Sequence, residues 1–188
     1  MTKDAVLAIL RKENDYISGE HISRLLGVSR AAVNTAVKAL RAEGYEISSS
    51  TNKGYHLDAV PNSISAQELA AYLDEARMQT VECLASVDST NNRLRELALA
   101  GAPNGQVVLA NEQTQGKGRR GRAFASPQDN GIYLSILFHP DTLPTDIVEI
   151  TAWTAVATNN AIEEVGGVRA GIKWVNDLVI DRKKICGI

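Results

Sequence analysis

Apolar residues near the amino terminus recur every three or four positions, which is the period of amphipathic helices. One apolar stripe lies within 4–11, and the next two comprise Ile22, Leu25 and Leu26, then Val33, Ala36, Val37 and Leu40. Gly27 is expected to end the second helix, Ser29 to cap the third helix, and Gly44 to end it. Two short helices joined by a glycine-containing turn are typical of a helix-turn-helix.

Polar side chains gather on the third helix, on the face opposite its apolar stripe. They are Arg30, Asn34, Thr35, Lys38 and Arg41. These residue types contact phosphates and base edges, and a recognition helix presents them to the major groove. The pattern therefore predicts DNA binding through this face, with Ser29 at the start of the helix.

Segment 45–57, YEISSSTNKGYHL, alternates around a polar tip and predicts a hairpin wing. Ile47 and Leu57 are expected to face the core, with Lys53 at the tip, where it would meet a DNA phosphate. Residues 1–60 are thus predicted to form a winged helix-turn-helix DNA-binding domain. The alternative is a small helical interaction domain with solvated basic residues, because this block holds eight Lys and Arg against seven Asp and Glu.

The pattern changes after DAVPNSIS, where strands and helices begin to alternate. Residues 61–65 are predicted to be a linker, and Ser65 to cap a helix that continues to about Ala76. Strands are expected in VECLASV, GQVVLANEQ and GIYLSILF, with a helix over about 91–100 between the first two. In GIYLSILF the apolar residues share one face; they are Ile132, Leu134, Ile136 and Phe138.

The remaining sequence predicts a long helix and a strand-rich end. The helix is expected over about 146–165, with Trp153 in the core. The segment 170–188 predicts strands with turns at 176–177 and 181–182. Residues 66–188 would then form a second, α+β domain built on a mixed sheet.

Composition narrows the classes of function. The formal net charge of -2 excludes a general polyanion binder, so any basic function must be local. Apolar runs are far shorter than the ~20 residues of a membrane span, and the amino terminus lacks a cleavage signature, so we expect a cytoplasmic protein without a membrane partner. Cys83 and Cys186 are expected to be reduced, buried thiols, because no CxxC or histidine cluster accompanies them.

The segment 112–127, EQTQGKGRRGRAFASP, concentrates glycines and cations between two predicted strands. Glycines let a backbone approach a ligand closely, and the cations require an anion. DNA is a poor candidate, because the loop lies beyond the linker and another element already suits DNA. The segment is not a Walker A loop, since GKGRRG lacks the GK[ST] ending. A phosphate-bearing small molecule is the better prediction.

Two further groups of polar residues are candidates for chemistry. The strand VECLASV ends in Asp88–Asn91, where exposed N–H groups and hydroxyls can bind a small polar ligand, although simple helix capping explains the same residues. Near the carboxyl end, polar residues stand in apolar, strand-rich surroundings and need partners or a function; they are Lys173, Asn176, Asp177 and Lys184. A solvated hairpin edge is the simpler explanation for Lys183.

The motifs DSTN, EQTQGKGRRGR, KWVNDL and RKKICGI stand in the order and spacing found in biotin–protein ligases. The chain resembles that family along its whole length, and the winged helix resembles the bifunctional branch that also represses biotin genes. The resemblance implies a class II synthetase-like catalytic domain. It also implies a two-step reaction, in which biotin and ATP form biotinyl-5′-AMP and a lysine of the biotin carboxyl carrier protein then takes the biotin. ATP, biotin and Mg²⁺ are the implied ligands.

The resemblance also implies roles for individual residues. On the biotin side, these are the turn residues Ser89, Thr90 and Asn91 together with Gln113. On the adenylate side, they are Lys117, Gly118 and Arg119, with Lys184 where carboxylate and phosphate join. Lys184 and Arg119 are the implied catalytic residues. Further nucleotide contacts are implied for Arg120, Arg122, Phe124, Asn176 and Asp177, and Asp177 is the candidate metal ligand. The implied macromolecular partners are operator DNA and a second copy of the chain, bound after the adenylate.

Three features depart from the family pattern. Lys117 replaces the usual arginine, which keeps the charge and loses the forked geometry. Val175 replaces the proline of KWPND, so a looser turn is expected. The sequence stops at Ile188, inside the last hairpin, so we expect an incomplete catalytic domain. This leaves two alternatives to a ligase-repressor, namely a ligand-sensing repressor without ligase activity and a lipoate–protein ligase.

Overall fold

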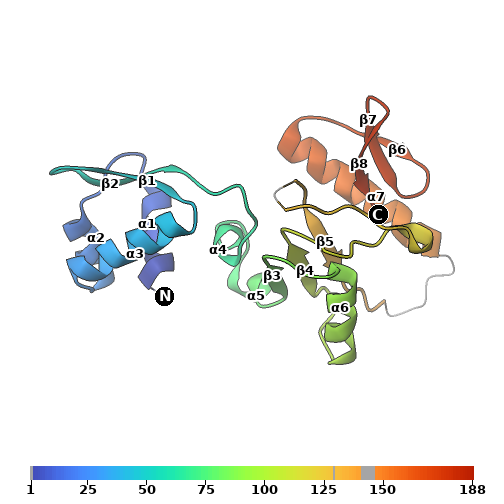
Figure 1. The fold of residues 1–188 in the computed structure, drawn as a ribbon, viewed down its shortest axis with the longest axis horizontal. Coiled ribbons are helices and arrows are strands. Elements are labelled where there is room, and N and C mark those ends of the chain that lie inside the picture. The colour runs from blue at the N-terminus through green and yellow to red at the C-terminus, as the bar shows by residue number, and fades with distance from the viewer. Residues whose placement is uncertain (1, 129, 141–146) are drawn as a thin grey trace.

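In the computed structural model, the amino-terminal residues fold as a winged helix (Figure 1). The structure describes residues 2–128, 130–140 and 147–188. Three helices, α1 (Thr2–Lys12), α2 (Gly19–Leu26) and α3 (Arg30–Ala42), precede a hairpin of strands β1 (Glu46–Ser50) and β2 (Gly54–Ala59). The predicted helix-turn-helix and wing are confirmed.

The ends of the helices follow from local capping. The hydroxyl of Ser29 accepts a hydrogen bond from the Ala32 N–H at 3.1 Å, and Gly27 takes the left-handed backbone (φ 63°) that ends α2. The apolar stripes meet in one core, in which Ile22, Val33 and Leu40 are fully buried. Removing these faces from water is the main stabilisation of the domain.

The wing is attached to the helices by backbone hydrogen bonds. Ile47 pairs with Leu57 across the hairpin, as predicted. The Ile17 N–H donates to the Tyr55 carbonyl and the Tyr55 N–H to the Ile17 carbonyl, both at 2.9 Å, so Ile17 forms an isolated antiparallel bridge to β2. This pairing brings Gly54 against the backbone of Ile17, where a side chain would not fit.

The helix predicted from Ser65 to about Ala76 is wrong in its length. Two short helices occupy this region, α4 (Ala66–Leu69) and α5 (Glu75–Met78). The Ser65 hydroxyl accepts from the Glu68 N–H, as a cap should, but the Asp74 carboxylate accepts from the Arg77 N–H at 2.7 Å and starts a new helix. A second capping residue therefore divides the predicted helix.

Helix α4 is joined to the winged helix by a charged cluster of Arg11, Tyr45 and Glu68. The Tyr45 hydroxyl donates to Glu68 Oε1 at 2.6 Å, and the Arg11 guanidinium forms an ion pair with the same carboxylate. The Arg11 and Glu68 side chains are only 19% and 15% exposed. Helix α4 is thereby held against α1 and the residue before β1. Asn111 of the second domain binds the linker through the Ile64 N–H and carbonyl at 2.8 and 2.9 Å.

Alkaline pH is expected to weaken this cluster. Burial, together with the bond to Glu68, raises the pKa of Tyr45 to about 12. An unfolded tyrosine ionises near pH ~10, so the contribution of Tyr45 to the free energy of unfolding is complete below that pH and is lost as the pH rises to about 12. Urea unfolding of wild type and Tyr45→Phe at pH 8, 10 and 11.5 measures this contribution to the free energy of unfolding. The difference between the two proteins should change above pH 10, and a constant difference would contradict the assignment.

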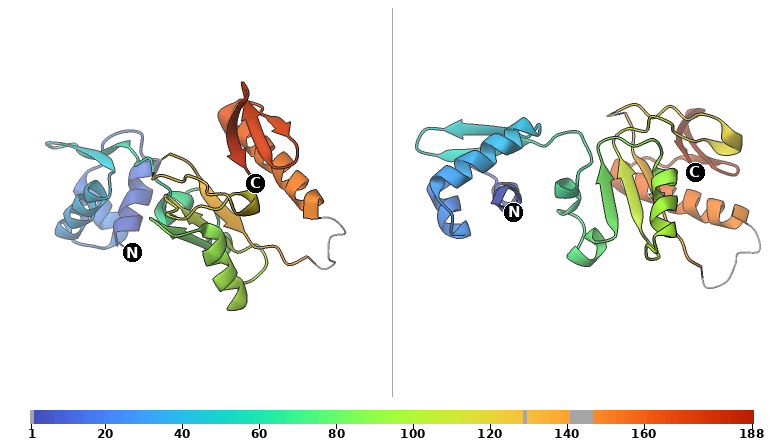
Figure 2. Two further views of the ribbon diagram at one scale, coloured as in Figure 1. Left: turned by 45° about the vertical axis from the view of Figure 1, so that its right-hand side comes forward. Right: turned by 60° about the horizontal axis from the view of Figure 1, so that its bottom comes forward.

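The second domain is organised around a three-stranded mixed sheet, as predicted (Figure 2). Strand β3 (Val81–Leu84) is parallel to β4 (Val107–Ala110), and β4 is antiparallel to β5 (Tyr133–Ile136). All four residues of β4 are buried, as expected for the central strand. Helix α6 (Thr90–Leu99) packs against β4 and β5 and covers one face of the sheet.

The alternation predicted along β5 is present, but the buried face is the polar one. Tyr133 and Ser135 are 8% and 7% exposed and face α6. The four apolar residues on the opposite face are all exposed; they are Ile132, Leu134, Ile136 and Phe138. Periodicity indicated two faces, and the position of α6 decided which of them is covered.

The carboxyl-terminal part is a long helix with a three-stranded meander beside it. Helix α7 (Ile147–Gly166) packs against β7 (Asp177–Ile180), which pairs with β6 (Gly171–Lys173) and β8 (Lys183–Gly187). The predicted turn at Asp181–Arg182 is confirmed, and both residues have positive φ (49° and 63°). The predicted helix start at Asp146 lies outside the described residues.

The inward face of α7 differs from the prediction. Ala155 is fully buried with Leu178, and the Asn159 amide binds the Ala170 backbone at both its N–H and its carbonyl. Trp153, predicted to be core, is 67% exposed, because it lies away from this inward row. Cys83 and Cys186 are free thiols, as predicted, but half-buried rather than buried, and burial raises the pKa of both. In the described part of the chain no helix is long and apolar enough to cross a membrane.

Candidate functional site

Gln113 is the centre of a polar network at the edge of the mixed sheet. Its Oε1 accepts from the Thr90 N–H at 2.9 Å and from the Thr90 hydroxyl at 3.0 Å, and its Nε2 donates to Ser126 Oγ at 3.0 Å. Gln113 follows β4 and forms bridges with Val87 on one side and Ser126 on the other. The structure therefore brings the predicted ligand turn and the predicted glutamine together.

The turn 89–91 begins α6 and offers polar groups beyond those that the helix uses. Ser89 occupies the cap position without making a capping bond, so the capping explanation fails for its side chain. Ser89 is fully buried, and its Oγ has no hydrogen-bond partner among the described residues. Asn91 is exposed, and Ser135 Oγ lies 2.7 Å from its side-chain amide. A buried hydroxyl without a partner is costly, which favours a ligand group at this place.

The basic loop folds back on itself as a hairpin. The Phe124 N–H donates to the Gly116 carbonyl at 2.8 Å and the Gly118 N–H to the Arg122 carbonyl at 2.7 Å, around a short 3₁₀ turn at Arg119–Gly121. A Cβ on Gly116 would lie 2.2 Å from the Phe124 carbonyl oxygen, so only glycine permits this approach. The loop returns beside Gln113, so its glycines position the cations next to the polar network.

Three of the predicted cations form polar contacts with other segments of the site. Lys117 Nζ donates to Asn92 Oδ1 at 2.5 Å, and Arg119 donates to Asn176 Oδ1 at 3.0 Å. Arg120 and Arg122 are exposed, and Arg120 has the left-handed backbone (φ 58°). The loop therefore links the start of α6 to the turn before β7.

Lys184 lies where the loop meets the meander, and the basic loop and the chain end are neighbours in both views of Figure 2. Its Nζ is 2.7 Å from Asp177 Oδ1 and 5.7 Å from the centre of the Phe124 ring. The side chain of Asn176 also donates to Asp177, at 3.0 Å. Asp177 thus holds the Lys184 ammonium in place while Phe124 covers it.

The described residues do not form a preassembled metal site. No group of three His, Cys, Asp or Glu side chains within 2–128, 130–140 and 147–188 converges on one point. Asp177, the predicted ligand, is already paired with an ammonium, which opposes a second cation on the same oxygen.

The predicted DNA face is exposed along α3. Four exposed residues lie on the side of α3 opposite the core; they are Arg30, Asn34, Thr35 and Lys38. Lys53 at the wing tip is also exposed, and its Nζ lies 5.9 Å from the centre of the Tyr16 ring. Ser29 caps the helix, as predicted, and is exposed at the start of the same face. Asn34 Nδ2 donates to the Tyr55 hydroxyl at 3.2 Å, so one recognition residue also contacts the wing.

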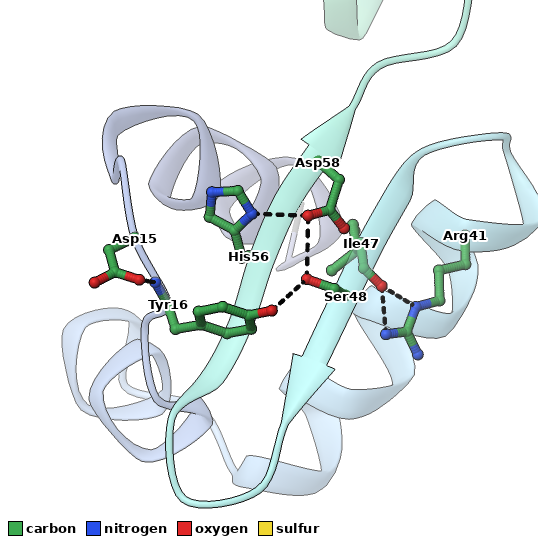
Figure 3. A network of polar contacts seen from close by, with 7 residues as sticks. All are labelled: Asp15, Tyr16, Arg41, Ile47, Ser48, His56 and Asp58. Carbon is green, nitrogen blue, oxygen red and sulfur yellow. Dashed lines mark hydrogen bonds and ion pairs between the residues drawn. The ribbon is translucent and has the colours of Figure 1, made fainter.

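Arg41 does not belong to the free DNA face, contrary to the sequence interpretation. Its guanidinium donates to the Ile47 carbonyl at 2.9 and 2.5 Å (Figure 3). It also donates to Ser49 Oγ, so it fastens the wing to α3. On the outer face of the wing, Figure 3 shows Asp58 between Ser48 and His56, which lie 3.2 and 2.9 Å from its Oδ1. These bonds stiffen the hairpin.

Sequence reasoning missed three polar residues that support the site, Asn92, Ser126 and Ser135. Ser126 and Ser135 are 4% and 7% exposed. The sequence pattern could have indicated Ser135, because it is a small polar residue at an inward position of an alternating strand. Asn92 and Ser126 carry no pattern, since their partners come from distant segments of the chain.

Two family models match the chain. The model described as the biotin/lipoate A/B protein ligase family matches residues 83–188, and that of an HTH domain matches residues 2–56. The chain is 37% identical over 189 residues to the bifunctional ligase/repressor BirA of Bacillus subtilis strain 168, covering 100% of this chain and 58% of that protein. It is 29% identical to the protein of the same name from Escherichia coli K12, covering 97% and 56%. The chain thus spans less than two thirds of these relatives.

Solved structures agree with this match. The biotin protein ligase of Aquifex aeolicus in complex with biotin and ATP is similar with a TM-score of 0.52 and 31% identity, over 57% of this chain and 44% of that one. The biotin protein ligase of Leishmania major in complex with biotinyl-5-AMP is similar with a TM-score of 0.50 and 25% identity, over 57% and 49%. These similarities support the α+β fold.

Proposed function

Since the chain belongs to the biotin/lipoate A/B protein ligase family, whose model matches residues 83–188, we propose that it is part of a biotin–protein ligase that also represses transcription. The observation that carries this proposal is the meeting of three segments at one place. The Gln113 network, the basic loop and Lys184 lie together, and they combine hydrogen-bonding groups for biotin with cations for a nucleotide.

The first step joins two anions, so the site must neutralise both. A biotin carboxylate oxygen attacks the α-phosphorus of ATP, the bond to the β-phosphate oxygen breaks, and pyrophosphate leaves. Lys184 stands at the junction and neutralises the carboxylate and the α-phosphate, while Lys117, Gly118 and Arg119 hold the phosphate side. The bond of Arg119 to Asn176 keeps the loop over the nucleotide. Phe124 covers the adenylate, and Arg120 and Arg122 stabilise the closed loop.

Biotin binds at the turn 89–91 and Gln113. The unpartnered Ser89 hydroxyl and the exposed Asn91 amide supply the hydrogen bonds that an N–H and C=O bearing ring requires. In the second step a carrier lysine attacks the acyl carbon of biotinyl-5′-AMP, and AMP leaves. The protein partner is the biotin carboxyl carrier protein.

Magnesium enters as the counter-ion of the ATP substrate. The pairing of Asp177 with Lys184 favours a positioning role for this carboxylate over the predicted role of metal ligand. Asn176, which donates to Asp177 and accepts from Arg119, then connects the loop with Lys184.

Biotin-dependent ATP–pyrophosphate exchange on this 188-residue chain tests the proposal. Exchange should require biotin, and lipoate should not replace it. Exchange with lipoate instead would favour the lipoate ligase. Tight binding of biotinyl-5′-AMP without any exchange would favour a ligand sensor that represses without ligase activity. Absence of both binding and exchange would overturn the assignment for these residues.

The winged helix is proposed to bind the operator of biotin genes. The HTH match and the exposed α3 face support this, and we propose that the adenylate favours a homodimer that binds the operator. Sedimentation with and without biotinyl-5′-AMP tests the dimer.

Arg30→Ala should weaken operator binding by about tenfold, as expected for the loss of a base or phosphate contact worth ~1–3 kcal/mol. Adenylate synthesis should not change, because Arg30 is exposed at the start of α3. Electrophoretic mobility shifts at two salt concentrations measure the effect. Glu20→Ala, an exposed change on α2, is the control. Unchanged operator affinity in Arg30→Ala would show that the DNA-binding face does not include Arg30.

A further inference from the structure

The side chain of Ser135 carries a buried hydroxyl that contacts the proposed biotin turn, residues 89–91. It lies on β5, is 7% exposed, and its Oγ is 2.9 Å from Thr90 Oγ1 and 2.7 Å from the side-chain amide of Asn91. A hydroxyl has one proton and cannot donate to both groups at full strength. Because each hydroxyl of the network carries one proton, its partners fix the direction of every bond.

The Thr90 backbone N–H can only donate, so the Gln113 atom 2.9 Å away must be the amide oxygen. The Thr90 hydroxyl lies 3.0 Å from the same oxygen, so it must donate its proton to that oxygen. Gln113 then presents its NH₂ to Ser126 Oγ, and the Ser126 hydroxyl is left to donate to the Phe124 carbonyl at 3.2 Å.

The Thr90 oxygen can now only accept a proton from Ser135. The single Ser135 proton is therefore used on Thr90. The structure has Asn91 Oδ1 2.7 Å from Ser135 Oγ, which would leave two acceptors facing each other without a proton, so the amide nitrogen should occupy this place instead. A half-turn of the Asn91 amide, which leaves its shape unchanged, places Nδ2 against Ser135 and turns Oδ1 toward the exposed side. The hydrogen bonds then run in one direction, from Asn91 through Ser135 and Thr90 to Gln113.

We propose that Ser135 is a positioning and specificity-determining residue, which makes the Asn91 amide oxygen the acceptor that faces the ligand. Such an acceptor selects a ligand ring that donates an N–H, as the ureido ring of biotin does, and disfavours the dithiolane ring of lipoate, which has no donor. This inference rests on the proposed function. Ser135 acts through Asn91 and Thr90, and makes no contact with the reacting atoms.

The test compares Ser135→Val with Ser135→Thr, because valine and threonine have the same shape and differ only in the hydroxyl. NMR of the ligand-free protein should show contacts between the Asn91 Nδ2 protons and the Ser135 β-protons. The Asn91 and Gln113 side-chain amide signals should shift strongly in Ser135→Val and only slightly in Ser135→Thr. Absence of the Asn91 contact, or equal shifts in the two variants, would overturn the proposed direction of the bonds.

Calorimetry tests the consequence for binding. Biotin should bind about tenfold more weakly to Ser135→Val than to Ser135→Thr, and ATP should bind equally to both. The Thr90→Val, Ser135→Val double variant should lose less than the sum of the single losses, because the two hydroxyls act in one chain. Equal biotin affinity in the two Ser135 variants would contradict the proposed role of Ser135 in ligand specificity. If the wild type shows the amide contacts and binds no biotin, the proposed function fails while the bond direction stands.

Discussion

Lys184→Ala is expected to lower biotin-dependent ATP–pyrophosphate exchange by at least about 100-fold. Removing a preorganised charge at the point where two anions react costs on the order of 3 kcal/mol in the transition state. The loss should appear mainly in kcat, because the charge matters most when the carboxylate reaches the phosphorus. The variant also leaves Asp177 without its ammonium, which places a repelling carboxylate beside the substrates.

Lys183→Ala is the matched control, since Lys183 is the exposed neighbour that pairs with Ile180 at the hairpin turn. Its exchange rate should stay within about twofold of wild type, because an exposed charge of this kind contributes little. Lys184→Ala, Asp177→Asn tests the repulsion and should regain part of the lost activity. Normal exchange in Lys184→Ala would remove the catalytic assignment, provided that amide spectra show a folded winged helix.

Gly54→Ala is expected to destabilise the winged helix by roughly 3 kcal/mol or more and to abolish operator binding. The new Cβ would lie 2.1 Å from the Ile17 carbonyl oxygen and 2.5 Å from the Ser18 Cα. Both are backbone atoms, which cannot move aside as a flexible side chain can. The backbone at Gly54 also has φ 113°, which alanine avoids. The pairing of Ile17 with Tyr55 should therefore break.

Gly27→Ala separates the effect of crowding from that of backbone conformation. Gly27 has φ 63°, but a Cβ there would have open space around it, so the expected cost is only about 1 kcal/mol. Urea unfolding, followed by hydrogen exchange at the amides of the winged helix, measures the destabilisation caused by Gly54→Ala and by Gly27→Ala. Trp153 and Trp174, the two tryptophans of the chain, lie in the second domain, so their fluorescence transition should stay unchanged in both variants. Equal destabilisation by the two changes would show that crowding at Ile17 is unimportant.

The cations of the site are held by partners that a substrate can replace or use. Lys117 binds a neutral amide, Arg119 binds another, and Lys184 binds a carboxylate. Neutral partners leave the positive charge available to an anion, whereas Asp177 lowers the net charge at Lys184. The strongest anion attraction should therefore come from the loop, and Lys184 should act chiefly at the junction of the substrates.

Much of the fold could be predicted from the sequence, because it depends on local rules. The stripes of the winged helix, the caps at Ser29 and Ser65 and the turn at Asp181–Arg182 act over a few residues. The helix over 65–76 was wrong because a local cap at Asp74 competed with the expected continuation. Trp153 was wrong because its surroundings depend on segments distant in the chain.

The sequence by itself determined most of the elements, the residue types of the candidate site and the family, because each depends on short motifs and regular spacing. Only the tertiary structure decided that Arg41 fastens the wing, that Asp177 holds Lys184, and that Ser135 faces the turn at Thr90. These contacts join residues that lie 6 to 45 positions apart along the chain. Packing of α6 on the sheet and the return of the basic loop create them, and no local pattern specifies a partner at such a distance.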